Sequence, residues 1–192
     1  MVSRVIKLFM SNDHKIRRVV VGNDEKGRSQ VLFDSDMPNV HQRPNSPGTY
    51  FNEIWTSEII PAKISSYKDT SPKGGHLRHS PPGNGVHWRI VQSSGERVVL
   101  SDAEARSSHE KMNKTGSSQL KKGGRHWNMH RTPTVDYGFC LRGERHLVLE
   151  EDDVLITQGT IVVQLGNWHA WDNRSNVPVN MAYVMMGGEF AS

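Results

Sequence analysis

Short apolar runs separated by turn residues fill the last third of the chain. They predict strands at residues 135–141, 146–149, 154–157, 160–165, 169–173 and 179–186. Six strands within about sixty residues, with no helix between them, favour an antiparallel all-β barrel or a two-sheet jelly roll. We therefore expect an all-β fold whose core spans residues 125–192.

The first half of the chain predicts fewer strands with longer connections. Residues 17–22 and 29–33 flank an Asn, Asp and Gly cluster, which indicates a hairpin. Residues 50–60 and 86–92 read as strands that extend one or both sheets. Pro and Gly mark 36–49 as a loop and 61–85 as an extended connection. Ser101 and Glu104 form a capping-box pattern, so one helix is expected at 102–114, on the surface because its apolar content is thin.

These elements predict a simple division of the 192 residues. Residues 1–16 show no period and are expected to be loosely ordered. Residues 17–100 form a β extension that packs on the barrel, residues 101–124 a helix and a mobile loop, and residues 125–192 the barrel core. This length fits one domain, or at most two small ones.

Composition narrows the function classes. The net charge of +4 comes from scattered Lys and Arg, which favours a solvated basic surface over nucleic-acid binding. The single cysteine, Cys140, excludes an intrachain disulfide framework and a cysteine-rich zinc site. No apolar run approaches the ~20 residues that span a bilayer. The N-terminus lacks a secretory pattern, so we expect a cytoplasmic protein without a membrane partner.

One segment carries a specific motif. Five residues separate Gly124 from His130, five separate His130 from Asp136, and six separate Asp136 from Gly143. This spacing resembles the first signature of the cupin family, which runs Gly, five residues, His-x-His, three or four residues, Glu, six residues, Gly. Two positions differ, because Thr132 occupies the place of the second His and Asp136 that of the Glu.

A second segment matches the other cupin signature. Gly166, His169 and Asn173 have its spacing, and Gln164 replaces its Pro. Residues 129–138 and 167–175 further resemble a subgroup of small single-domain cupins whose fungal members often accompany secondary-metabolite pathways. The resemblance implies a cupin jelly-roll barrel, with an N-terminal strand extension and one short surface helix. It also implies a homodimer, as does the cost of exposed edge strands.

The motif residues predict a site inside the barrel. His130, Thr132, Thr134 and Asp136 share one face of a strand if no bulge intervenes, although Pro133 favours an edge or a bulge. His169 would join them from another strand. Two imidazoles and a carboxylate suit a divalent metal such as Zn, Fe or Mn. The alternative is a metal-free site in which His130, Asp136 and His169 act as acid and base.

Several neighbours are candidates for contacting a substrate, together with Thr132 and Thr134. A surface position is the alternative for His126, an inert buried thiol for Cys140, and core packing for the others. The candidates are His126, Cys140, Trp171, Met181 and Tyr183.

The sequence thus predicts a small-molecule enzyme. The missing second His favours non-oxidative acid/base or Lewis-acid chemistry, such as dehydration, decarboxylation, isomerisation or cyclisation, on an aromatic or polyketide-like secondary metabolite. The alternatives are an Fe(II)-dependent dioxygenase and a non-catalytic cupin that binds a ligand, because one fold hosts many functions.

Overall fold

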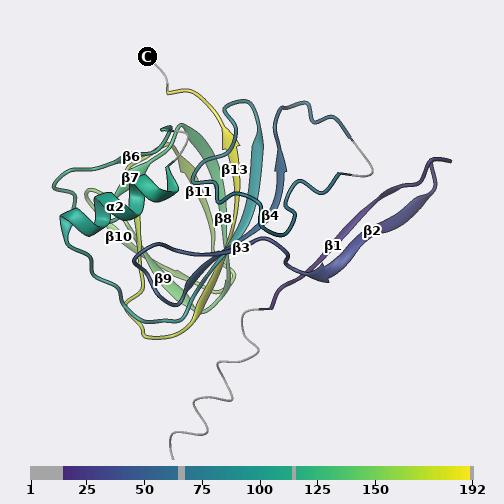
Figure 1. The fold of residues 1–192 in the computed structure, drawn as a ribbon. Helices are drawn as coiled ribbons and strands as arrows, with labels where there is room; N and C mark the ends of the chain where they lie inside the picture. The colour runs from purple at the N-terminus through teal and green to yellow at the C-terminus, as the bar shows by residue number, and fades with distance from the viewer. Residues whose placement is uncertain (1–14, 65–67, 114–115, 191–192) are drawn as a thin grey trace, which may run out of the picture.

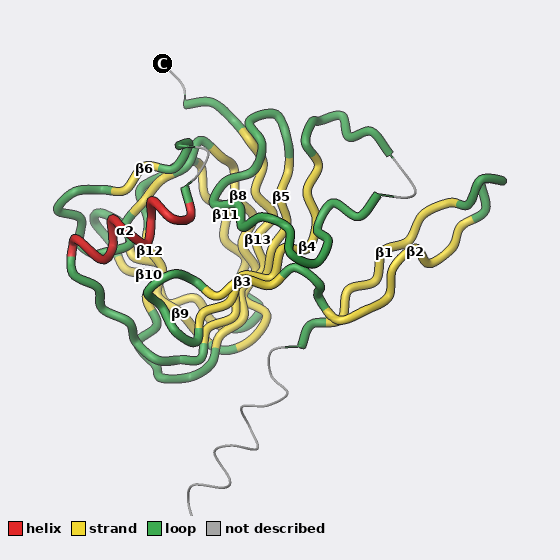
Figure 2. The backbone as a smooth tube through the Cα atoms, in the orientation of Figure 1, coloured by secondary structure: helices red, strands yellow, loops and turns green. Residues whose placement is uncertain are grey.

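The computed structural model describes residues 15–64, 68–113 and 116–190. Its largest element is a six-stranded antiparallel sheet in the order β11-β8-β13-β5-β4-β3 (Figures 1 and 2). The strands are β3 (Val40–Gln42), β4 (Thr49–Ser57), β5 (Val86–Ser93), β8 (Thr134–Arg142), β11 (Ile161–Leu165) and β13 (Val179–Gly187). The predicted N-terminal extension therefore joins the barrel edge to edge, within one sheet.

The second sheet is smaller and has the order β10-β9-β12. Its strands are β9 (Glu144–Val148), β10 (Asp153–Thr157) and β12 (Ala170–Asp172). The short pair β6 (Gln119–Leu120) and β7 (His130–Arg131) continues this sheet, because an isolated antiparallel bridge joins His130 to His169 just before β12. The two sheets form the antiparallel jelly-roll barrel that the sequence predicted.

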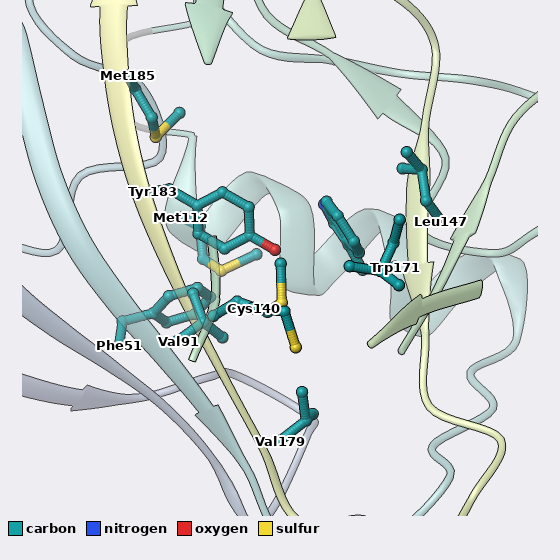
Figure 3. Close-up of a cluster of buried hydrophobic side chains, with 11 residues drawn as sticks. Phe51, Val91, Met112, Cys140, Leu147, Trp171, Val179, Tyr183 and Met185 are labelled. Atoms are coloured by element: carbon teal, nitrogen blue, oxygen red, sulfur yellow. The ribbon is translucent and has the colours of Figure 1, made fainter. Parts of the chain in front are cut away.

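Alternation along β8 shows how the sequence closes the barrel. Thr134, Asp136 and Cys140 are buried, whereas Tyr137 between them is exposed. Successive side chains of a strand point to opposite faces, so one face of β8 lines the interior. The buried core between the sheets is drawn in Figure 3, where Trp171 of the smaller sheet faces Tyr183 of β13.

The hairpin of β1 (Arg17–Asn23) and β2 (Ser29–Asp36) forms a separate two-stranded sheet. It extends away from the barrel (Figure 1). At its base, Arg18 donates hydrogen bonds to the Asp69 carboxylate and to the backbone oxygen of Ile54. The hairpin is thus held to the barrel by a buried charge pair.

Helix α2 (Asp102–Met112) begins at the predicted capping box. The Ser101 hydroxyl accepts a hydrogen bond from the Glu104 amide, and the Glu104 carboxylate accepts one from the Ser101 amide. The helix lies at the surface, as predicted: most of its residues are exposed, and one face, with Ala105, His109 and Met112, is buried. One face of the helix is thus buried and the other exposed, although few of its residues are apolar.

All six strands predicted for the last third are confirmed, as are the hairpin and the strands at 49–57 and 86–93. The predictions missed β3, β6 and β7, each only two or three residues long, because so short a pairing leaves no periodic pattern. Most of the segment expected to be loosely ordered, residues 1–14, lies outside the described residues. Within the described ranges, no helix is long and apolar enough to cross a membrane.

Candidate functional site

A cavity of about 90 Å³ lies inside the barrel. Apolar side chains form one part of its wall: Phe51, Val91, Met112, Trp171, Tyr183 and Met185. Polar side chains form the rest: Arg43, His79, Arg89, Asn128, His130, Thr132, Asp136, Arg145, Gln164 and His169. Small-molecule sites typically combine apolar walls with convergent polar groups, and this cavity has both, with polar residues in the majority.

His130 and His169 lie side by side in this cavity. Their backbones exchange two hydrogen bonds, His130 N to His169 O at 2.8 Å and His169 N to His130 O at 3.0 Å. This pairing brings the two ring centroids to 4.5 Å from each other. The predicted meeting of these imidazoles is confirmed, and its cause is the β-bridge between two segments far apart in the sequence.

Both imidazoles have a fixed tautomer. Nδ1 of His130 lies 2.7 Å from the backbone oxygen of Asn128, and Nδ1 of His169 lies 3.0 Å from that of Asn167. A carbonyl oxygen can only accept, so each Nδ1 carries the proton and each neutral ring has a bare Nε2. Burial lowers the pKa of His169 to about 4. Burial, and then the neighbouring His169, hold the pKa of His130 well below its ordinary value. At neutral pH both rings are therefore neutral, and each bare Nε2 can accept a hydrogen bond.

Asp136 and Tyr183 face the same cavity from the large sheet. Burial raises the pKa of Asp136 to about 6, against a hydrogen bond from Thr134 that lowers it. Burial also raises the pKa of Tyr183 above its ordinary value. Oδ1 of Asp136 and the Tyr183 hydroxyl are both buried without a hydrogen-bond partner. Figure 3 shows this hydroxyl directed into the space beside Trp171. Asp136 thus supplies a carboxylate oxygen free to accept a proton, and Tyr183 a protonated hydroxyl free to donate a hydrogen bond.

The predicted metal ligands do not form a metal site as they stand. The part of the chain that the structure describes holds no cluster of three His, Cys, Asp or Glu side chains placed to share a cation. The strand is interrupted at Pro133, because β7 ends at Arg131 and β8 begins at Thr134. His130 therefore lies in the β6-β7 pair and Asp136 in the six-stranded sheet, and both side chains line the cavity. We derive no chemical step through a metal.

Four of the predicted substrate contacts lie outside the cavity wall. Cys140 and Met181 belong to the hydrophobic core, and the Cys140 thiol points to the backbone oxygens of residues 142 and 143. Thr134 is buried and bonds the hydroxyl of Thr132 at 2.6 Å. His126 lies 3.8 Å from a carboxylate oxygen of Asp172, beside the cavity. The cavity does include the predicted Thr132, Trp171 and Tyr183.

The sequence reasoning missed the arginines of the wall. Scattered Arg residues were expected on a solvated surface, but Arg43, Arg89 and Arg145 are buried in the cavity wall. Arg145 was detectable, because it shares the inward face of β9 with Leu147, two residues on. Arg43 lies in a loop, where no period indicates which way a side chain points. The same holds for His79, whose ring contacts that of His130 edge to face.

Polar atoms without partners concentrate around this cavity. Among the described residues, twelve buried side-chain nitrogen or oxygen atoms have no hydrogen-bond partner, and seven of these belong to the cavity wall. The seven are Nε of Arg43, Arg89 and Arg145, Nδ1 of His79, Oδ1 of Asp136, Oε1 of Gln164 and the hydroxyl of Tyr183. Buried polar groups normally find partners, so this concentration points to a ligand.

The two motif segments that resemble the cupin signatures thus lie on paired β segments and turn their residues into one cavity of a two-sheet jelly roll. The chain thus has the antiparallel jelly-roll architecture that the resemblance implied. No family model matches its sequence.

Comparisons with known proteins give partial matches. Two proteins of Diaporthe leptostromiformis, named phomopsin biosynthesis cluster proteins C′ and D, are 45% identical over 49 residues, which are 25% of this chain and 26% of each relative. The match thus spans about a quarter of the relatives' length.

Two solved structures resemble the chain over most of its length. The Cnp3 cupin domain of Schizosaccharomyces pombe is 10% identical, with a TM-score of 0.42, and the alignment covers 91% of this chain and 88% of that one. A putative ethanolamine utilization protein of Salmonella typhimurium is 7% identical, with a TM-score of 0.44 over 91% of this chain and 98% of that one.

Proposed function

We propose that this protein is a small-molecule enzyme that catalyses a non-oxidative proton transfer in its barrel cavity. The observation that carries this proposal is that Oδ1 of Asp136 and the Tyr183 hydroxyl, both buried without a hydrogen-bond partner, belong to residues that line one cavity with the neutral imidazoles of His130 and His169. Together they offer bases and a donor within a water-restricted space, which suits general acid–base catalysis.

Each group has a defined role in this proposal. Asp136 removes a proton from the substrate, and its carboxyl then holds that proton. The Tyr183 hydroxyl donates a hydrogen bond to the substrate oxygen on which negative charge develops. The neutral ring of His130 or His169 accepts a hydrogen bond from the substrate at Nε2 and so helps to orient it. Return of the proton from Asp136 to carbon gives an isomerisation or cyclisation, and its return to a leaving hydroxyl gives a dehydration.

The pathway context of the partial relatives supports a biosynthetic role. Both are named as biosynthesis cluster proteins. The small cavity limits the substrate to a compact molecule, or to the reacting end of a larger one. We therefore propose a secondary metabolite as substrate, of which a short aromatic or polyketide-like portion enters the barrel.

Exchange of substrate hydrogens with solvent deuterium tests this function directly. We expect the purified protein to catalyse exchange, dehydration or isomerisation of at least one compound in a panel of β-keto acids, β-hydroxy acids and 1,3-diketones, followed by NMR. In the Asp136→Asn variant this rate should be at least about 100-fold lower than in the unaltered protein, because the Asn side chain does not accept a proton.

The matched control is Asp152→Asn, which removes an exposed carboxylate in the turn between β9 and β10 and should keep the full rate. Equal rates for Asp136→Asn and the unaltered protein would contradict the proposed role. Loss of activity with a chelator, with recovery on adding Zn²⁺, Fe²⁺ or Mn²⁺, would replace it by metal-dependent chemistry.

A further inference from the structure

Two pairs of buried arginines have opposite electrostatic environments. Arg18 donates hydrogen bonds to both carboxylate oxygens of Asp69. Arg89 contacts both carboxylate oxygens of Glu53, at 3.0 and 3.2 Å. Burying a charged group is normally offset in this way, by a partner of opposite charge. The charge of each of these two arginines is thus balanced by a carboxylate, although Nε of each is also buried without a hydrogen-bond partner.

Arg43 and Arg145 are equally buried, with 9% and 7% of their surface exposed. Among the described residues, neither has a carboxylate within 4.0 Å. Arg43 donates only to the side-chain oxygen of Asn128, and Arg145 only to the backbone oxygen of Trp171. Nε of each is buried without a partner. Both side chains line the cavity.

The two guanidinium groups also act on each other. Burial lowers the pKa of Arg43 to about 9, and the positive charge of Arg145 lowers it further. Both groups remain charged at neutral pH. The Asp172 carboxylate acts on Arg145 from beyond ion-pair distance and is itself paired with Arg97 and Arg174. Two buried like charges without a direct counter-ion oppose folding, and an apolar side chain of similar size would be neutral or stabilising there. Such a cost is commonly retained at functional sites, where a ligand offsets it.

We propose that Arg43 and Arg145 together bind a carboxylate group of the substrate. That the bound acid is a substrate rests on the proposed function. That the site binds an anion is inferred from the two arginines alone. The planar guanidinium fork matches a planar carboxylate with two parallel hydrogen bonds. Aromatic and aliphatic side chains beside it, such as Trp171 and Phe51, suit the organic part of such an acid.

The cavity favours a carboxylate over a phosphate. Phosphate sites typically use backbone amides at a helix N-terminus. The only residue of α2 in the cavity wall is Met112, which is the last residue of that helix. The anion is therefore met by side chains alone. Because Asp136 lines the same cavity and lies within ion-pair distance of neither arginine, the anchored acid and the proposed base occupy separate parts of the wall.

Binding of a simple acid tests the anchor without any turnover. We expect propionate to bind saturably and to shift the NMR signals of the Nε–H groups of Arg43 and Arg145, whereas the neutral isostere propionamide leaves both signals in place. Arg43→Gln and Arg145→Gln should each weaken propionate binding at least about tenfold. Arg145→Lys should bind propionate more tightly than Arg145→Gln but less tightly than the unaltered protein, because Lys keeps the positive charge and lacks the planar guanidinium group.

Arg18→Gln is the matched control, because Arg18 is equally buried but lies at the hairpin. It should lower stability and leave propionate binding unchanged. If a Gln variant does not fold, Arg43→Met and Arg145→Met replace it, and these should keep or raise Tm while propionate no longer raises Tm. Asp136→Asn should bind propionate at least as tightly as the unaltered protein, so loss of catalysis and loss of the anchor are distinguishable.

Three outcomes would overturn the inference. The first is equal binding of propionate and propionamide, which would show that charge is not recognised. The second is binding of inorganic phosphate in place of propionate. The third is propionate binding that survives in both Gln variants, because the anion would then be held elsewhere.

Discussion

At the scale of single residues, the protonation state of each buried group follows from what surrounds it. His126 illustrates this. Burial lowers its pKa to about 4, although the neighbouring Asp172 acts in the opposite direction. Arg145, Arg43 and Arg174 add to the lowering. Its Nδ1 accepts a hydrogen bond from the backbone amide of residue 128, which stabilises the neutral ring. The folded protein therefore binds a proton at this site less readily than the unfolded chain.

We expect this imidazole to make the protein sensitive to acid. The folded pKa of about 4 lies below the unfolded value near 6.5, so the unfolded chain takes up the proton first as the pH falls. Stability should be constant above pH ~6.5 and should fall between about pH 6.5 and 4, by up to about 3 kcal/mol from this residue. Urea unfolding at a series of pH values measures this loss.

The His126→Asn variant should show a shallower decrease over the same pH range. The exposed His76 provides the control, and His76→Asn should follow the curve of the unaltered protein. An unchanged slope in His126→Asn would show that the buried ring does not contribute to acid sensitivity.

At the scale of elements, helix α2 depends on its cap and on one buried face. Most of its residues are polar, so the helix gains little from burial outside Ala105, Ser108, His109 and Met112. Its last residue, Met112, forms part of the cavity wall. The order of this helix and the shape of the site are thereby linked.

Removing the cap should loosen the helix. Ser101→Ala abolishes the hydroxyl that accepts from the Glu104 amide, and we expect a loss of about 1 kcal/mol in the free energy of unfolding. Hydrogen exchange of the amides in α2 should accelerate more than exchange in β8. Ser107→Ala inside the helix is the control and should cost nothing, since Ala has the higher helix propensity. Equal effects of the two substitutions would contradict the capping role.

At the scale of the whole molecule, contacts between distant segments hold the parts in place. The hairpin is connected to the barrel through Arg18 and Asp69, whose side chains are 4% and 17% exposed. The cavity is likewise assembled from both sheets, from α2 and from the loop that carries His79. The homodimer, the absence of a nucleic-acid partner and the cytoplasmic location remain predictions.

The pair at the base of the hairpin should be important for stability. Asp69→Asn leaves the buried Arg18 charge without its counter-ion, and we expect a loss of about 3 kcal/mol in the free energy of unfolding. Asp34→Asn breaks the exposed ion pair with Arg17 and should cost less than about 1 kcal/mol. Urea unfolding of both variants checks this contrast, and similar losses would show that burial does not set the strength of these pairs.

Patterns among residues close together in the sequence predicted most of the secondary structure of this protein. Alternating apolar positions fixed the six C-terminal strands, and Ser101 with Glu104 fixed where the helix begins, because these signals act between residues near each other in the chain. The motif spacing also located His130, Asp136 and His169 in one cavity.

Only the tertiary structure decided how those residues are arranged. It paired His130 with His169 and placed Asp136 in the six-stranded sheet. Pairing between strands and the interruption at Pro133 set the distances between these side chains, and the spacing of the residues along the chain does not predict them. It also buried Arg43 and Arg145 without carboxylate partners. The strand pattern of β9 indicates an inward Arg145, but Arg43 lies in a loop, and for both residues the absence of a carboxylate partner depends on segments far away in the sequence.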